Sequence, residues 1–181
     1  MHFYDRYEAG QILSQKLLQY RERPDVIVLG LPRGGVPVAY EVAKALAVPL
    51  DVFLVRKLGL PGHEELAMGA VADGNVTVFN EQVAKSLAVP QHLIDEVAAR
   101  EWKELQRQRE LYRDGEPPPN VKDLIVILVD DGLATGSTVR AAIAALRKQE
   151  PKRIVVAVPV GAAETCAELR EQADEIVCAL V

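Results

Sequence analysis

Five continuous apolar runs alternate along the chain with longer amphipathic stretches, and this alternation limits the possible folds more than any other feature. The runs lie at Val26–Leu29, Val52–Val55, Leu124–Val129, Ile154–Val158 and Ile176–Val181. Runs without polar interruptions are typical of strands buried on both faces of a sheet. The amphipathic stretches, with apolar residues at helical spacing, lie at Glu8–Tyr20, Val36–Ala47, Gln91–Tyr112, Thr138–Gln149 and Ala163–Gln172. The pattern predicts an α/β fold with a doubly wound, mainly parallel sheet and helices on both faces.

One domain accounts for the whole chain of 181 residues. A chain of this length has single-domain size and buries about two-thirds of the surface that its unfolded form exposes. We therefore expect one domain over residues 1–181. Consecutive prolines in Glu116–Asn120 indicate a structureless connector inside it, because proline donates no backbone hydrogen bond.

The segment Leu58–Asn80 differs from its surroundings in composition. Glycine and proline recur in it among short apolar pieces, which predicts a long loop that runs into a short hairpin around Asp73–Asn75. We expect residues 57–80 to form a flexible insertion. Long loops in compact domains often serve as lids over a functional site.

Net charge, cysteine pattern and the lack of an apolar leader or span limit the binding partners, bound metals and cellular location that we expect. The net charge of −5 argues against a surface that binds nucleic acid or an anionic membrane. Cys166 and Cys178 form no CxxC pair and the histidines are scattered, so neither a zinc site nor a disulfide framework is indicated. The N-terminus is charged and the longest apolar run, Ile154–Ala163, is too short to span a bilayer. We expect a soluble, cytoplasmic protein without nucleic-acid or membrane partners.

The most informative motif runs from Leu128 to Thr138, where a buried strand ends in Asp130 and Asp131 and a hydroxyl-rich turn opens a helix. Unpaired N–H groups at a helix start bind anions, and Gly136 allows a close approach of the backbone. Adjacent carboxylates suit ribose hydroxyls or hydrated Mg²⁺. The segment is not a Walker A loop, because the lysine is missing and the spacing is one residue short. In the alternative interpretation, the hydroxyl residues only cap the helix and the aspartates form a solvated strand end.

Val129–Thr138 resembles the motif that binds 5-phosphoribosyl-1-pyrophosphate (PRPP) in type I phosphoribosyltransferases, in the DD-x-x-ATG-x-T form of the adenine and xanthine branches. The resemblance implies that Asp130 and Asp131 bind the ribose hydroxyls of PRPP, and that their contact with Mg²⁺ is indirect, through those hydroxyls or water. It places the 5′-phosphate in the turn formed by Ala134, Thr135, Gly136, Ser137 and Thr138. The hypoxanthine-guanine branch has an aspartate where this chain has Ala134, so a route through that aspartate to the purine N7 is absent here.

Two further stretches resemble the family in the same order. Leu31–Val36 resembles its pyrophosphate loop, with Arg33, Gly34 and Gly35 as the candidate contacts. Without the resemblance, the two glycines would serve equally well for tight packing between strand and helix. Arg56 and Lys57, directly after a predicted strand, resemble the basic pair that opens the family's flexible catalytic loop; such a pair is otherwise a solvated strand exit.

The resemblance covers nearly the whole chain. One group of phosphoribosyltransferases, assigned from motifs, carries F-x-D-R-x-x-A-G, L-P-R-G-G-V and R-K-x-G-x-P-x-x-x-E-x-A-x-G-A-V. These are matched here by Phe3–Gly10, Leu31–Val36 and Arg56–Val71. Family members continue after the last strand into a segment that helps cover the acceptor base, whereas this chain stops at Val181. We therefore expect a reduced hood built from the first roughly 20 residues, and the completeness of the polypeptide is left open.

The resemblance implies a Mg²⁺-dependent pentosyltransferase. It would move the 5-phosphoribosyl group from PRPP to a nitrogenous base of unidentified kind and release pyrophosphate, with Arg56 and Lys57 as catalytic residues beside the leaving group. Its partners would be PRPP, a small-molecule acceptor and a second copy in a homodimer. Two alternatives stay open: a non-catalytic module of the same fold that senses PRPP or nucleotides, and an enzyme on another phosphorylated ribose, such as a phosphoribosyl hydrolase.

Overall fold

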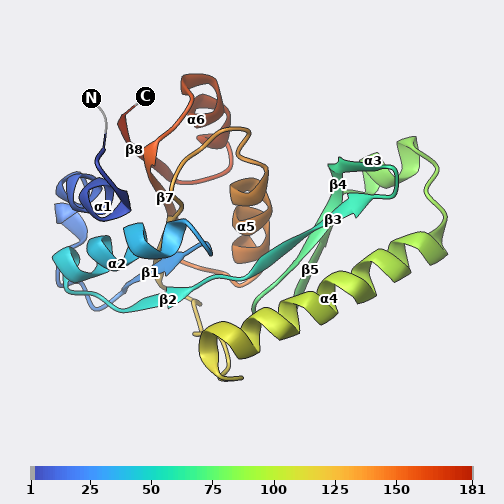
Figure 1. The fold of residues 1–181 in the computed structure, drawn as a ribbon, viewed down its shortest axis with the longest axis horizontal. Helices are drawn as coiled ribbons and strands as arrows, with labels where there is room; N and C mark the ends of the chain where they lie inside the picture. The colour runs from blue at the N-terminus through green and yellow to red at the C-terminus, as the bar shows by residue number, and fades with distance from the viewer. Residues whose placement is uncertain (1–2, 181) are drawn as a thin grey trace.

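A five-stranded parallel sheet forms the body of the molecule (Figure 1). The computed structural model describes residues 3–180, so Met1, His2 and Val181, the last residue of the final predicted strand, lie outside the described part. The strands are β1 (Val26–Gly30), β2 (Leu50–Val52), β6 (Ile125–Val129), β7 (Arg153–Val160) and β8 (Glu175–Leu180), in the order β2-β1-β6-β7-β8. All neighbours in this sheet are parallel, which confirms the predicted fold class.

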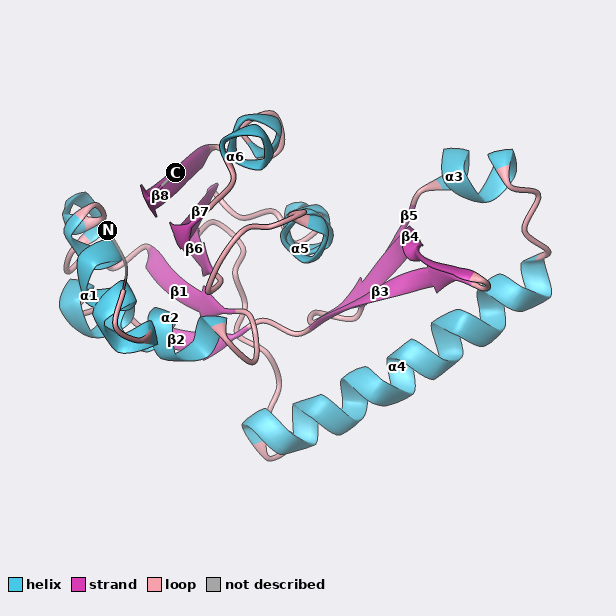
Figure 2. Ribbon diagram, turned by 45° about the horizontal axis from the view of Figure 1, so that its top comes forward, coloured by secondary structure: helices cyan, strands magenta, loops and turns pink. Residues whose placement is uncertain are grey.

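Helices cover both faces of this sheet, as the sequence predicts (Figure 2). On one face lie α1 (Arg6–Gln15), the 3₁₀ turn η1 (Leu18–Tyr20) and α2 (Gly35–Leu46); on the other lie α5 (Ser137–Arg147) and α6 (Ala163–Leu169). Successive strand residues point to opposite faces, so Ile127 packs on the α1–α2 side and Leu128 on the α5–α6 side. The inner strands β1, β6 and β7 are therefore buried on both faces, which explains their continuously apolar sequences. None of the helices within residues 3–180 has an apolar stretch long enough to cross a membrane.

The segment Leu58–Asn80 belongs to a second sheet, which corrects the expectation of a long loop. Three antiparallel strands follow one another: β3 (Val55–Leu60), β4 (His63–Ala72) and β5 (Val76–Phe79). The predicted hairpin turn around Asp73–Asn75 is present between β4 and β5. The glycines of this segment led to the prediction of a loop. At Gly69, however, glycine lies in a strand, and a Cβ there would come within 1.9 Å of the carbonyl oxygen of Val78. This glycine serves close pairing of strands rather than a turn.

The predicted strand Val52–Val55 is divided between the two sheets. β2 ends at Val52, the chain crosses over through Phe53 and Leu54, and β3 begins at Val55. The pair at positions 56–57 therefore lies within a strand and not after one, contrary to the prediction. From this crossover the chain builds an arm that projects from the body (Figures 1 and 2).

Helix α4 covers the small sheet and not the central one. The arm comprises β3, β4, β5, the short helix α3 (Glu81–Ser86), which the sequence analysis missed, and α4 (Gln91–Arg113). Leu58 and Met68 of the small sheet pack with Ile94 of α4. Val76 and Val78 join the core cluster of α5 on the opposite side. The small sheet thus lies between two helices, α4 on one side and α5 on the other.

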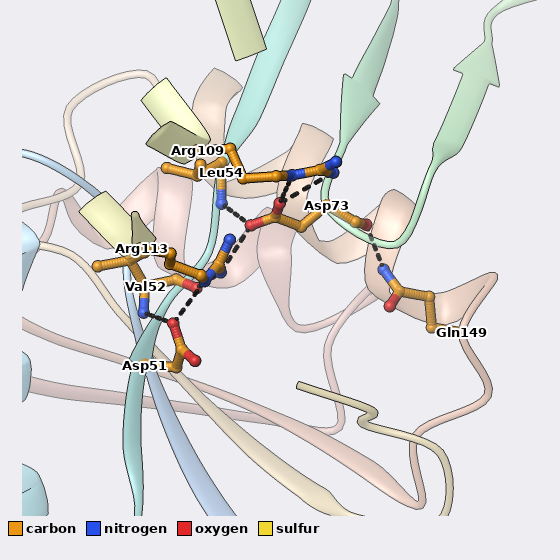
Figure 3. Close-up of polar contacts among 7 residues, drawn as sticks. All are labelled: Asp51, Val52, Leu54, Asp73, Arg109, Arg113 and Gln149. Atoms are coloured by element: carbon orange, nitrogen blue, oxygen red, sulfur yellow. Dashed lines mark hydrogen bonds and ion pairs between the residues drawn. The ribbon is translucent and has the colours of Figure 1, made fainter. Parts of the chain in front are cut away.

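A buried carboxylate, Asp73, joins the arm to the body (Figure 3). Its side chain is 1% exposed and accepts hydrogen bonds from the backbone N–H of Leu54 and from the guanidinium of Arg113, each at 2.8 Å. Arg109 donates to its other carboxylate oxygen at 3.4 Å. The side chain of Gln149, just after α5, donates to the main-chain carbonyl of Asp73 at 2.8 Å. One residue thereby connects the crossover, α4 and the end of α5.

Arg113 fastens the last turn of α4 to the edge of the central sheet. Its side chain is 5% exposed. Besides Asp73, the guanidinium donates to the carboxylate of Asp51 at 2.9 Å and to the carbonyl of Val52 at 2.5 Å. The base of the arm is therefore held by buried, charge-assisted hydrogen bonds.

The two cysteines lie beside each other in the core, where small apolar residues are expected. Cys166 of α6 is buried, Cys178 of β8 is half-buried, and both are free thiols with their sulfur atoms 2.8 Å apart. Burial raises the pKa of the Cys178 thiol to about 12. A thiol with this pKa is a poor nucleophile at neutral pH.

Candidate functional site

The loops that follow β1 and β6 meet at the carboxyl ends of these two neighbouring strands. After β1 the chain enters α2 on one face of the sheet, and after β6 it enters α5 on the other. Helices that diverge in this way leave a crevice between the loops, where α/β proteins bind ligands. The N–H of Leu31 donates to the carbonyl of Val129 at 2.9 Å. This hydrogen bond joins the two loops at their first residues and sets the distance between them.

The glycines at 34 and 35 allow the two loops to touch. A Cβ at Gly34 would lie 2.1 Å from Oδ2 of Asp131, and one at Gly35 would lie 2.6 Å from the carbonyl oxygen of Val129. A side chain at position 34 would displace the carboxylate of Asp131, and one at position 35 would press on the main chain that leads into the acidic pair. Arg33, at the tip of the same loop, is exposed and can reach toward a ligand. The structure thus brings the predicted pyrophosphate loop and the acidic pair together.

The two adjacent aspartates have different environments. Burial raises the pKa of Asp130 to about 6, and the negative charge of Asp131 adds to this effect. One oxygen of Asp130 accepts the N–H of Asp131 at 2.9 Å, which opposes the rise. The side chain of Asp131 is 37% exposed and is paired with a cation. Asp130 is therefore partly shielded from water, whereas the charge of Asp131 is balanced by a cation.

Arg6, which the sequence analysis did not single out, is the partner of Asp131. Its Nε and Nη2 atoms donate to Oδ2 at 3.0 and 2.8 Å. Asp5 caps α1 by accepting a backbone N–H of the first turn at 2.8 Å. A Cβ at Gly10 would lie 2.8 Å from a carbonyl oxygen of α2, so glycine allows α1 and α2 to pack closely. The F-x-D-R-x-x-A-G segment thus places a guanidinium on the acidic pair, and its membership in that motif is the signal that points to Arg6.

The turn at 134–138 has the backbone that anion binding requires. Gly136 has a φ of +71°, and a Cβ there would also lie 2.8 Å from the methyl group of Thr165. The hydroxyl of Thr165 donates to the carbonyl of Ala134 at 2.7 Å and supports the turn from α6. Ser137 and Thr138 open α5, whose first N–H groups have no partner within the helix. All five predicted phosphate contacts, the exposed Thr135 included, lie in this turn.

Arg56 and Lys57 point to opposite sides of the small sheet, because successive strand residues alternate. Nζ of Lys57 donates to the hydroxyl of Ser137 at 2.9 Å, which places this cation at the turn before α5. Nε of Arg56 donates to the carboxylate of Glu101 on α4 at 2.8 Å. The sequence analysis treats the two as one pair, whereas the structure gives them separate partners.

A pocket of about 440 Å³ lies where Leu31 and Pro32 of the loop after β1, and Thr138 at the start of α5, face the base of the arm. Its polar lining includes Arg56, Lys57 and Thr138, together with Arg100, Glu101 and Gln108 of α4. The sequence predicts α4 only as an amphipathic helix, and these last three residues are missed. No local pattern marks them, because the contact between Arg56 and Glu101 joins residues 45 positions apart.

A second pocket, of about 580 Å³, borders Asp131 on the side of the N-terminal segment. Its lining includes Phe3, Tyr4, Arg6, Tyr7, Pro37 and Pro159. Tyr4 is 92% exposed and Tyr7 54% exposed, so the pocket is open to solvent. The described part of the N-terminal segment covers the acidic pair only partly.

We expect Asp130→Asn to stabilise the protein at pH 8 and to leave its stability nearly unchanged at pH 4. With the pKa of Asp130 raised from 3.8 to about 6 by folding, the free energy of unfolding of the wild type falls as the pH rises through this window. Asparagine avoids this cost. The shift corresponds to at most about 3 kcal/mol, which solvent screening reduces to about 1 kcal/mol. Urea unfolding of both proteins at the two pH values measures the difference; an equal gain at both would contradict the assigned cause.

Comparison with known protein sequences points to one family. A family model described as "Phosphoribosyl transferase domain" matches residues 5–75 and 62–180. Two Mycobacterium tuberculosis proteins, "Putative phosphoribosyl transferase MT0597" and "Putative phosphoribosyl transferase Rv0571c", are each 44% identical to this chain over 176 residues, which cover 97% of this chain and 40% of theirs. The chain thus spans less than half the length of these curated relatives. The bifunctional protein PyrR of Clostridium acetobutylicum is 30% identical over 74% of this chain and 56% of its own length.

Solved structures share the fold. The crystal structure of TT1426 from Thermus thermophilus matches with a TM-score of 0.88 and 41% identity, over 100% of this chain and 85% of that one. A purine phosphoribosyltransferase from Pyrococcus horikoshii matches with a TM-score of 0.55 and 21% identity, over 100% of this chain and 85% of that one. The second likeness concerns the fold alone.

Proposed function

The chain belongs to the phosphoribosyl transferase family, and from this we propose that it transfers the 5-phosphoribosyl group of PRPP to a nitrogenous base and releases pyrophosphate. The observation that carries the proposal is the meeting of three segments, distant in sequence, at one crevice. Loop 31–35 touches the acidic pair at 130–131, and Lys57 reaches the turn at 134–138. The three segments supply different groups, each suited to a different part of PRPP.

Each part of PRPP has a matching set of groups in this assignment. The 5′-phosphate is bound by the turn at 134–138, through helix N–H groups and the hydroxyls of Thr135, Ser137 and Thr138. The ribose hydroxyls donate to Asp130 and Asp131. The pyrophosphate lies on the backbone of loop 33–35, which carries Arg33, and faces the pocket that contains Arg56 and Lys57.

The proposed reaction needs positioning and charge stabilisation more than covalent catalysis. The bond between the anomeric carbon and a pyrophosphate oxygen breaks, the base nitrogen bonds to that carbon, and the base loses its N–H proton. Positive charge develops on the ribose, beside Asp130 and Asp131, and negative charge on the leaving group, beside Arg33, Arg56 and Lys57. Because the small sheet and α4 are already formed around this pocket, they help to exclude water from it.

Mg²⁺ fits this site as an ion shared with the substrate. Within the described residues, no group of three or more His, Cys, Asp or Glu side chains forms a cage for a metal. Asp130 and Asp131 offer carboxylate oxygens to a cation held through ribose hydroxyls or water. Proteins commonly bind Mg²⁺ through one or two carboxylates together with substrate phosphates. When bound, the ion neutralises charge on the pyrophosphate.

The open pocket beside Asp131 is our candidate for the acceptor. Phe3, Tyr4 and Tyr7 offer aromatic surfaces on which a planar heterocycle can stack. The guanidinium of Arg6, in the same lining, offers hydrogen-bond donors to an oxygen of the base. Because Ala134 has no proton donor or acceptor in its side chain, the base is recognised from the N-terminal side in this proposal.

Calorimetric titration of PRPP into the protein, with and without Mg²⁺, tests the proposal before any acceptor is known. We expect binding that strengthens when Mg²⁺ is present. Absence of binding at about 1 mM PRPP, equivalent to a binding free energy weaker than about −4 kcal/mol, would overturn the assignment.

Turnover separates the transferase from its alternatives. Pyrophosphate release that depends on an added base indicates a transferase. Pyrophosphate release without any base indicates a hydrolase, and PRPP binding without release across a panel of bases indicates a sensing module.

A further inference from the structure

Helix α4 lines the pocket that the proposed pyrophosphate faces, although the family motifs give this helix no role. The charged residues that line the pocket of about 440 Å³ are Arg56, Lys57 and Glu64 of the small sheet and Arg100 and Glu101 of α4. Three cations and two carboxylates give the lining a net positive charge. A compact polyanion is the ligand class that suits such a lining.

Glu101 controls the direction of Arg56. The carboxylate accepts Nε of Arg56 at 2.8 Å, and its side chain is 12% exposed, so the ion pair is shielded from water on one side. A long arginine side chain has many rotamers, and a shielded, charge-assisted hydrogen bond at Nε selects among them. Among the residues that the structure describes, no hydrogen bond or ion pair engages the Nη atoms of Arg56, so they can meet another acceptor.

Arg100 shares the same carboxylate. Its Nε lies 3.6 Å from the second oxygen of Glu101, while its side chain stays 68% exposed. Glu101 therefore stands between two guanidinium groups that both line the pocket. Arg100 is exposed enough to reach an incoming anion, and Arg56 is held in place to meet one.

The position of Glu101 is fixed by the rest of α4. Toward the C-terminus, Arg109 and Arg113 bind Asp73 at the base of the arm, as Figure 3 shows. Arg113 lies twelve residues after Glu101, about 18 Å along the helix. Toward the N-terminus, Ile94 and Val97 pack in the core of the small sheet. A helix anchored on both sides of Glu101 can hold its carboxylate at a constant distance from β3.

We infer that α4 forms part of the pyrophosphate subsite: Glu101 is a positioning residue that directs Arg56 into the pocket, and Arg100 supplies a further cation to the bound pyrophosphate. This inference rests on the proposed function, because it assigns the pocket to the leaving group of that reaction. It gives the projecting arm a part in substrate binding.

A double-mutant cycle with inorganic pyrophosphate and Mg²⁺, measured by calorimetry, tests the role of Glu101. We expect Arg56→Ala to weaken pyrophosphate binding about tenfold in the wild-type background and less than about threefold in a Glu101→Ala background. Glu101→Gln keeps an acceptor oxygen for Nε, so the larger loss should return in that background. Glu96→Gln, on the exposed side of the same helix, is the matched control. An equal loss from Arg56→Ala in all backgrounds would overturn the positioning role.

Arg100→Ala tests the second part of the inference. We expect it to weaken pyrophosphate binding about fivefold and to leave binding of ribose 5-phosphate unchanged, because the latter lacks the group that Arg100 meets. Arg107→Ala removes the same charge from the same helix, but at a side chain that is 61% exposed and pairs with Glu104, and should change neither affinity. Equal losses for both ligands, or for both variants, would overturn the role of Arg100.

The wild-type titrations separate the failure of this inference from the failure of the proposed function. Binding of PRPP without binding of pyrophosphate overturns the inference and leaves the proposed function standing. Binding of neither ligand overturns both. Melting curves of each variant verify that the fold is intact, and Glu101→Gln gives a reading even where Glu101→Ala does not fold.

Discussion

Replacing Arg113 by methionine is expected to lower the free energy of unfolding by about 3 kcal/mol. The change leaves the carboxylate of Asp73, 1% exposed, without its 2.8 Å guanidinium partner. It also removes the hydrogen bonds to Asp51 and to the carbonyl of Val52. Breaking a buried ion pair by removing one partner costs about 3–5 kcal/mol, and the lower value applies because Leu54 and Arg109 still donate to Asp73. Urea unfolding measures the loss.

Two further variants separate the loss of the ion pair from the loss of side-chain packing. Asp73→Asn added to Arg113→Met removes the buried negative charge that has lost its closer guanidinium partner, and should restore about 1 kcal/mol. Arg107→Met, on the same helix at an exposed site, should change stability by less than about 0.5 kcal/mol. A loss below about 1 kcal/mol for Arg113→Met would contradict the view that this network holds the arm to the body.

Asp130→Asn combined with Asp131→Asn is expected to weaken PRPP binding at least about tenfold, or about 1.4 kcal/mol, without unfolding the domain. Both changes keep the shape of the side chains while removing the negative charge that accepts the ribose hydroxyls. Asp131 also loses a charged partner in Arg6, which then faces a neutral amide. Calorimetry with PRPP and Mg²⁺ measures the affinity, and circular dichroism verifies the fold.

A matched pair of substitutions on α4 controls for net charge. Asp95→Asn with Glu96→Gln removes two negative charges from exposed positions outside the pockets at the site, and should leave PRPP affinity within about twofold of the wild type. Unchanged affinity in the folded Asp130→Asn, Asp131→Asn protein would exclude the acidic pair from ribose binding.

The central sheet could be predicted because its inner strands β1, β6 and β7 are buried on both faces, and such burial leaves a continuous apolar run in the sequence. The small sheet could not be predicted in this way, because its strands lack such a run. β3 carries Arg56, Lys57 and Gly59 within its six residues, and β4 contains Gly69 where the neighbouring backbone approaches closely. These residues serve the site and the close strand pairing, and they hide the apolar pattern that marks the other strands.

Those parts of the candidate site that lie within one short stretch of sequence could be predicted. The acidic pair, the turn at 134–138 and the two glycines each stand inside one short motif. Arg6 and Glu101 act through partners 125 and 45 positions away, and no local spacing encodes such contacts. Strand alternation adds a second limit, because neighbours in sequence such as Arg56 and Lys57 point to opposite sides once they lie in a strand.

The contact between Gly34 and Asp131 makes the effect of a mutation at one position depend on the residue at the other. Arg6 holds the carboxylate of Asp131 at the place where a Cβ of residue 34 would come within 2.1 Å of it. Gly34→Ala is therefore costly next to aspartate and mild next to glycine or alanine at position 131. With respect to folding stability alone, lineages that descend from this chain can change both positions at low cost in one order only. The aspartate is replaced first, at the expense of its proposed contact with the ribose, and the glycine becomes free to vary afterwards.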